Sequence, residues 1–173
     1  MIHVALLVLR LGIGLTVAAH GAQKLFGWFD GPGVDGFAGW LQAMGLKPPR
    51  FWSLNAALAE FAGGLLVALG LITPIAGLVV SGSMLVAIFT VHAGKGFFSQ
   101  KGGWEFPFGI LLVMLAISVA GPGVFSLDQV LGIRLPEPAT WAVAAILVVV
   151  GAGAALVSPK LPERTRQEKP RLA

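Results

Sequence analysis

The sequence predicts an all-α integral membrane protein, with a bundle of four transmembrane helices followed by a fifth. Of its 173 residues, 56% are hydrophobic and only 12% are charged, which lies outside the usual range of soluble domains. The apolar residues form blocks close to the roughly 20 residues that a helix needs to cross the hydrocarbon core of a bilayer. Glycine and proline separate the blocks, so the chain is expected to turn between them.

The first predicted helix covers residues 4–26 and carries Arg10 inside its apolar run. A cleaved signal peptide would have basic residues before its apolar core, and nothing basic except one histidine precedes Arg10, so this segment is predicted to remain as a span. Arg10, Val17 and Lys24 recur every seven residues and share one face, with His20 one turn before Lys24. That face is predicted to point into the bundle.

A short amphipathic helix, residues 34–46, is predicted after the first span. Phe37, Trp40, Leu41 and Met44 fall at helical spacing beside small or polar residues, a pattern typical of a helix lying in the membrane interface. Two roles remain open. The segment either covers the end of the bundle or forms a lid over a lipophilic ligand.

The second and third predicted helices, residues 51–71 and 74–92, form an antiparallel hairpin. Pro74 marks the turn, because proline breaks a helix interior but is tolerated in the first turn. The fourth predicted helix, residues 105–120, is short and ends at a Gly-Pro-Gly sequence. A further surface turn is expected after it, where Ser126 and Gln129 have the spacing of a helix cap.

The fifth predicted helix, residues 139–157, consists almost entirely of apolar residues and glycine and contains no ionisable side chain. It is typical of an anchoring or packing helix. Gly151 and Ala155 are four residues apart, a spacing that lets helices approach closely and that permits a homo-oligomer. Similar small pairs occur in the other spans, and they are Gly12 with Thr16, Ala59 with Gly63, and Gly77 with Ser81.

The basic residues predict the orientation of the chain, because lysine and arginine collect on the cytoplasmic side of membrane proteins. Five of the twelve lie in residues 158–173, which are predicted to form a disordered cytoplasmic tail. With five spans, a single basic residue, Arg134, falls on the opposite side, so the N-terminus is predicted to lie outside. The formal charge of +4 is therefore a topology signal, and nucleic acid is not an expected partner. The remaining basic residues on the cytoplasmic side are Lys24, Lys47, Arg50, Lys95 and Lys101.

Charged residues within the spans were placed by depth, using the helical rise of about 1.5 Å per residue. Glu60 is about 14 Å and Arg10 about 21 Å from the cytoplasmic end, so the two are predicted to pair. The pair can be structural or can serve proton or redox chemistry.

Four further polar side chains are expected near one level at the cytoplasmic end, and they are His20, Lys24, His92 and Glu105. Each also has a structural explanation. The histidines can cap helices, Lys24 can snorkel to headgroups, and the Glu105 carboxylate can interact favourably with the N-terminal end of its helix dipole. A haem held by the two histidines is not expected, because two histidines without an attachment signal are weak evidence. The absence of cysteine excludes disulfides and thiolate ligands within the chain.

Four motifs follow one another along the chain, and they are HGAQKLFGWFDGPG (20–33), AEFAGGLLVALGLITP (59–74), AIFTVHAGKGFFSQKGGWEFP (87–107) and AGPGVFSLDQ (120–129). With these motifs in this order, the sequence resembles the DoxX family of small bacterial membrane proteins. The resemblance covers roughly residues 4–131 and includes Arg10 in the first helix.

The resemblance implies a four-helix membrane domain, here residues 1–138, in the bacterial inner membrane, and association with redox complexes. It selects as motif positions the residues His20, Gln23, Lys24, Glu60, His92, Gly103 and Glu105, which coincide with the polar groups placed by depth. From these we expect catalytic roles for Glu60, His92 and Glu105. Ligand-binding roles are expected for Arg10, His20, Gln23, Lys24, Trp28 and Trp104, with no metal site.

Three functions follow as hypotheses. The preferred one is a membrane subunit of a quinone-linked oxidoreductase, which binds a quinone or quinol where apolar walls meet convergent polar groups. The second is a non-catalytic scaffold that docks soluble redox enzymes through its cytoplasmic loops and tail. The third is a small transporter or lipophile carrier that uses the same cavity. In each case the bilayer is a partner, and in the first two a redox protein is another.

Overall fold

The computed structural model describes residues 1–157, so the predicted tail, residues 158–173, lies outside the described residues. The described chain is helical without strands, which confirms the predicted all-α class. The elements in order are α1 Ile2–Phe26, α2 Gly33–Ala43, α3 Pro49–Leu69, α4 Thr73–Ala87, the π turn η1 Ile88–His92, the 3-10 turns η2 Ala93–Lys95 and η3 Ser99–Lys101, α5 Glu105–Ala120, α6 Leu127–Leu131 and α7 Ala139–Leu156.

Four helices are long and apolar enough to cross a membrane, namely α1, α3, α7 and the continuous stretch Thr73–Lys95 that contains α4. Helix α5 is apolar but has only 16 residues, fewer than the roughly 20 that span the hydrocarbon core. Ser126 caps α6 as its spacing predicted, since its Oγ accepts a hydrogen bond from the backbone N–H of Gln129.

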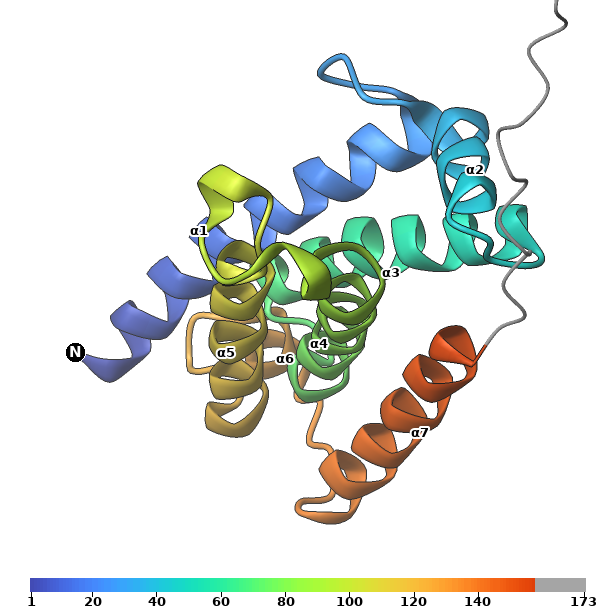
Figure 1. Ribbon diagram of the computed structural model, residues 1–173. Coiled ribbons are helices and arrows are strands. Elements are labelled where there is room, and N and C mark those ends of the chain that lie inside the picture. The colour runs from blue at the N-terminus through green and yellow to red at the C-terminus, as the bar shows by residue number, and fades with distance from the viewer. Residues whose placement is uncertain (158–173) are drawn as a thin grey trace, which may run out of the picture.

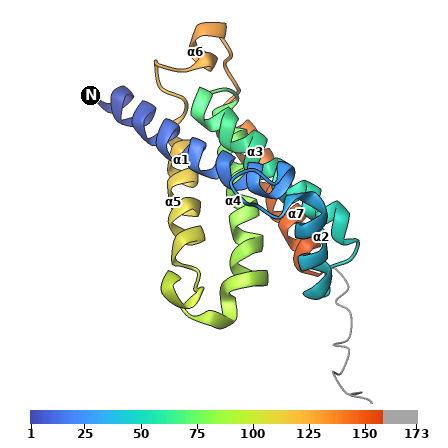
Figure 2. The same cartoon turned by 90° about the horizontal axis from the view of Figure 1, so that it is seen from above.

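The helices form two antiparallel pairs, with α1 beside α3 and α4 beside α5, and α7 packs on the outer side of α4 (Figure 1). Figure 2 shows the N-terminus and α6 at one end, and α2 and the connection between α4 and α5 at the other. The motifs of the sequence therefore separate into two groups at opposite ends of the bundle. One of these groups lies around α2.

Small residues bring α1 and α3 into close contact and fix their register. A Cβ atom on Gly14 would lie 2.7 Å from the backbone nitrogen of Ala68, and one on Gly64 would lie 2.6 Å from that of Ala18. The predicted pair of Gly12 with Thr16 is not part of this contact, because a Cβ on Gly12 would meet nothing within 4 Å. The contact with α3 instead uses Gly14, the next glycine along α1.

The remaining core lies where α1, α3, α4 and α5 meet. Val17, Val67, Val80, Met114 and Ile117 are its most deeply buried apolar residues. Since these side chains come from all four helices, the core holds the four-helix domain together, and α7 contributes none of them.

Candidate functional site

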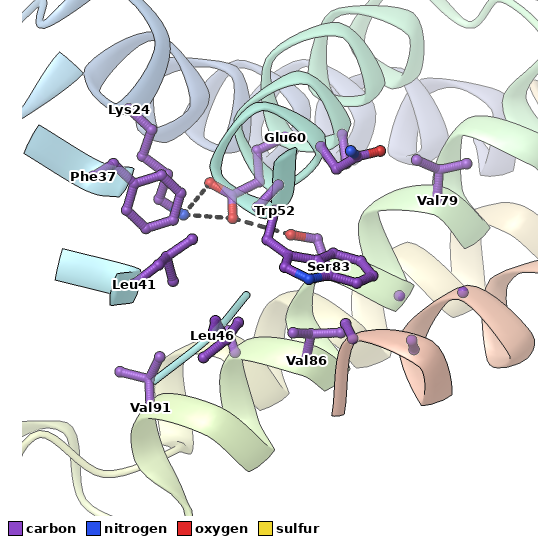
Figure 3. A pocket seen from close by; sticks show the side chains of 18 of the residues that line it. Lys24, Phe37, Leu41, Leu46, Trp52, Glu60, Val79, Ser83, Val86 and Val91 are labelled. Carbon is purple, nitrogen blue, oxygen red and sulfur yellow. Dashed lines mark hydrogen bonds and ion pairs between the residues drawn. The ribbon is translucent and has the colours of Figure 1, made fainter. Parts of the chain in front are cut away.

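A cavity of about 410 Å³ opens at the α2 end of the bundle. Residues of α1, α2, α3, the α4 stretch and α7 line it, and Figure 3 shows Lys24 and Ser83 directed toward Glu60 at its inner wall. Most of the remaining wall is apolar. Aromatic rings contribute much of that wall, and they belong to Phe37, Trp40 and Trp52.

A buried ion pair forms the polar part of the cavity. Lys24 Nζ lies 2.6 Å from Glu60 Oε1 and 2.5 Å from Oε2, and Ser83 Oγ donates to Oε1 at 3.2 Å. The Glu60 side chain is 2% exposed and that of Lys24 is 27% exposed. Lys24 Nζ also stands 5.2 Å from the centre of the Phe37 ring. Lys24 therefore does not snorkel to headgroups; it satisfies a carboxylate that would otherwise be buried without a counter-charge.

The predicted pair of Arg10 with Glu60 is wrong, and the register of α1 against α3 gives the reason. Gly14 faces Ala68, so Arg10, one turn earlier, meets the end of α3 at Gly70. The depth estimate placed the start of α3 level with the end of α1. In the structure α3 extends past that end, which brings Glu60 to Lys24.

Arg10 belongs to a second buried polar cluster at the opposite end of the bundle. Its side chain is 1% exposed, its Nη2 donates to the carbonyl of Phe125, and its Nη1 fills the space that a side chain on Gly70 would need. The Asp128 carboxylate acts electrostatically on the Arg10 charge. Arg10 is therefore outside the candidate site.

Asp128, which the sequence analysis did not select, ties this cluster to α4. It is 3% exposed, and its carboxylate accepts hydrogen bonds from the backbone N–H of Ile72 at 2.8 Å and of Thr73 at 3.1 Å. Thr73 Oγ1 also donates to it, at 3.2 Å. A carboxylate at the start of a helix accepts hydrogen bonds from the free N–H groups there and interacts favourably with the positive end of the helix dipole. A sequence signal existed, since Asp128 lies two residues after Ser126, inside the predicted surface turn.

His92 lines the cavity, and the π turn at the end of the α4 stretch positions it. Such turns occur frequently at functional sites because they rotate the following side chains relative to a regular helix. His92 Nδ1 lies 2.7 Å from the carbonyl oxygen of Gly102. A carbonyl can only accept, so Nδ1 carries the proton, and in the neutral ring Nε2 is an acceptor.

The other predicted histidine, His20, lies outside the cavity. It is exposed, and its ring packs edge-on against Phe106 at 5.6 Å between centroids. The reason is helical rotation, because His20 is one residue, or about 100°, away from Gly21, which packs on α3. The two histidines therefore do not share one site.

Glu105 and Trp104 shape the loop between α4 and α5 without lining the cavity. Glu105 is exposed, and its Oε2 accepts a hydrogen bond from the backbone N–H of Ser99 at 2.9 Å. Trp104 packs between the rings of Phe97 and Phe108. Both residues support the loop that holds the Gly102 carbonyl against His92.

Gln23 and Trp28 likewise serve the turn after α1. Gln23 Nε2 donates to the carbonyl of Phe29 at 3.3 Å, and Gly31 packs so closely on Gln23 that a side chain there would overlap it. Trp28 is 55% exposed and contacts Phe26 and Phe29. Of the predicted site residues, the cavity thus brings together Lys24, Glu60 and His92.

Residues that the sequence analysis did not assign to a site complete the cavity. Ser83 is one of four hydroxyl residues on the α4 stretch, and its position relative to Glu60 gave no sequence signal. Gly151 and Ala155 of α7 both line the cavity; Ala155 is only 5% exposed, whereas Gly151 is exposed. A homo-oligomer stays a prediction.

Comparisons with known proteins identify a family and two relatives of this chain. The chain is 30% identical over 126 residues to the "Putative oxidoreductase CatD" of Bacillus subtilis, covering 73% of this chain and 86% of that protein. It is 29% identical over 124 residues to the "Inner membrane protein YqjF" of Escherichia coli, covering 69% of this chain and 92% of that protein. No solved structure gives a significant match. The DoxX family profile matches residues 5–93, and this multi-pass membrane protein belongs to the DoxX family.

Proposed function

We propose that this chain is the membrane subunit of a quinone-linked oxidoreductase and that it binds a quinol in the cavity beside Lys24 and Glu60. The observation that carries the proposal is the buried ion pair at the wall of an otherwise apolar, aromatic cavity. Small-molecule sites commonly combine such apolar walls with a few convergent polar groups. The name of the Bacillus subtilis relative supports an oxidoreductase role.

The polar groups of the cavity suit a ring with hydroxyl groups. Two N–H groups of Lys24 are used by Glu60, which leaves the third to donate to a ligand oxygen. His92 Nε2 accepts, so it pairs with a hydroxyl and not with a carbonyl. A quinol presents both a donor and an acceptor at each oxygen, whereas the oxidised quinone presents acceptors alone.

The chemistry assigned to the chain is binding and proton acceptance. Oxidation of a quinol to a quinone releases two electrons and two protons. His92 Nε2 can take one proton from the hydroxyl that it contacts, and the second proton leaves to water at the open end of the cavity. The electrons pass to a redox partner protein, because the chain contributes no cysteine and no dinucleotide-binding motif.

A titration of the purified protein in detergent with a short methylated benzoquinol tests this function. Quenching of tryptophan fluorescence reports binding, since Trp40 and Trp52 line the cavity. Wild type is expected to show saturable binding, and His92→Ala to weaken it roughly tenfold, because one hydrogen bond to the ligand is lost.

The matched control is His20→Ala, which lies outside the cavity and should leave the dissociation constant unchanged. The same ring in its oxidised form should bind wild type more weakly than the quinol. Equal losses in both histidine variants, or no saturable binding in folded wild type, would contradict the proposal.

The proposed orientation has the N-terminus outside and the C-terminus in the cytoplasm of a bacterial inner membrane. Lys24 precedes α2 in the chain and Lys47 and Arg50 follow it, and the name of the Escherichia coli relative supports the location. A reporter active only in the cytoplasm should be active when fused after Ala173. A periplasm-active fusion at that position would reverse the assignment.

A further inference from the structure

A second cavity of about 460 Å³ lies between α4 and α7, further from the ion pair. Its lining is apolar apart from Thr140, and it includes Ile75 of α4 and Ala144 and Leu147 of α7. Among residues 1–157, no charged side chain lines it. Such a space suits a hydrocarbon chain and offers nothing to a polar headgroup.

The two cavities meet at one side-chain contact. Val79 and Val148 line both of them. Val148 Cγ1 lies 2.5 Å from the point that a Cβ on Gly82 would occupy, so the valine packs into the gap left by the glycine. On either side of this contact a cavity separates α4 from α7. Val148 therefore divides one groove between the two helices into two parts.

The groove follows most of the length of α7. Its lining residues on this helix extend from Ala139 to Ala155, about 24 Å at the helical rise of 1.5 Å per residue. Helix α7 is also the least enclosed of the candidate spans, with 11% of its apolar window buried.

We infer that this groove is a binding site for the hydrocarbon tail of the ligand. The inference rests on the proposed function, in which the ring lies beside Lys24 and Glu60. The groove is polar where it begins, at Lys24 and His92, and apolar beyond Val148. That order matches an amphiphile with one polar ring and one long chain, and the tail of a membrane quinol has this chemistry. A bilayer acyl chain has no ring to occupy the polar end.

The test compares two ligands that differ only in the tail, a methylated benzoquinol without a side chain and the same ring carrying a decyl chain. Both are titrated into the full-length protein at one detergent concentration, and the ratio of their dissociation constants is taken for each variant. Ala144→Phe and Ile75→Trp fill the second cavity from opposite walls. The matched control is Ala142→Phe, on the exposed side of the same helix.

Both cavity-filling variants should lower the advantage of the decyl compound by roughly tenfold, the effect of excluding about two methylene groups from a buried site. Binding of the tail-less ring, and the ratio in the control variant, should stay at the wild-type value. An unchanged ratio with normal binding of the tail-less ring would overturn the tail site, leave the quinol site standing and assign the second cavity to bilayer lipid. Failure of wild type to bind either compound would overturn both.

Discussion

Replacing Lys24 with methionine is expected to lower the free energy of unfolding by about 3 kcal/mol. The change leaves the Glu60 carboxylate, which is 2% exposed, without its counter-charge, and removing one partner of a buried ion pair is strongly destabilising. Glu60→Gln should cost less, roughly 1–2 kcal/mol, because the longer and more exposed Lys24 can then extend toward the interface. Thermal unfolding in detergent, followed by circular dichroism, measures both values.

The double variant separates the pair from its surroundings. With both charges removed, the loss should be smaller than the sum of the single losses, since neither charge remains unpaired. Lys101→Met is a suitable control because that side chain is exposed and no such effect is expected there. Strictly additive losses would show that the two side chains do not interact. Quinol binding should be lost in the double variant even though part of the stability is kept. This difference separates the role of the pair in stability from its role in binding.

Replacing Asp128 with asparagine is expected to destabilise the protein by roughly 1–3 kcal/mol without affecting the cavity directly. The buried carboxylate accepts hydrogen bonds from the backbone N–H groups of Ile72 and Thr73 through its two oxygens, and asparagine replaces one of these acceptors with an amide N–H group that can only donate. Thermal unfolding in detergent again provides the measurement.

The control for this effect is Asp35→Asn. Asp35 pairs with Arg50 at 3.6 Å, but both side chains are more than 70% exposed, at 85% and 73%, so the loss should be near zero. Equal small losses in both aspartate variants would show that the Arg10 cluster does not hold the α6 end of the bundle.

Much of the fold could be predicted from the sequence, because the relevant information is local. Block lengths and composition predicted the helical spans, Pro74 predicted the turn between α3 and α4, and the spacing of Ser126 and Gln129 predicted the cap of α6. The inward face of α1 also followed from periodicity, since Arg10 and Val17 are both 1% exposed. Burial of a single helix face depends on residues that are close in the chain.

The partners of the charged residues could not be predicted in this way. The sequence determined that Arg10, Lys24 and Glu60 would face the interior of a helical membrane protein. Which of them pair was decided by the stagger of α3 against α1, set by the contacts of Gly14 and Gly64. A depth counted from helix ends carries no information about that stagger, and a shift of a few residues exchanges one cationic partner for another. Likewise, rotation alone separates His20 from the cavity that His92 lines, and only the packed tertiary structure fixes it.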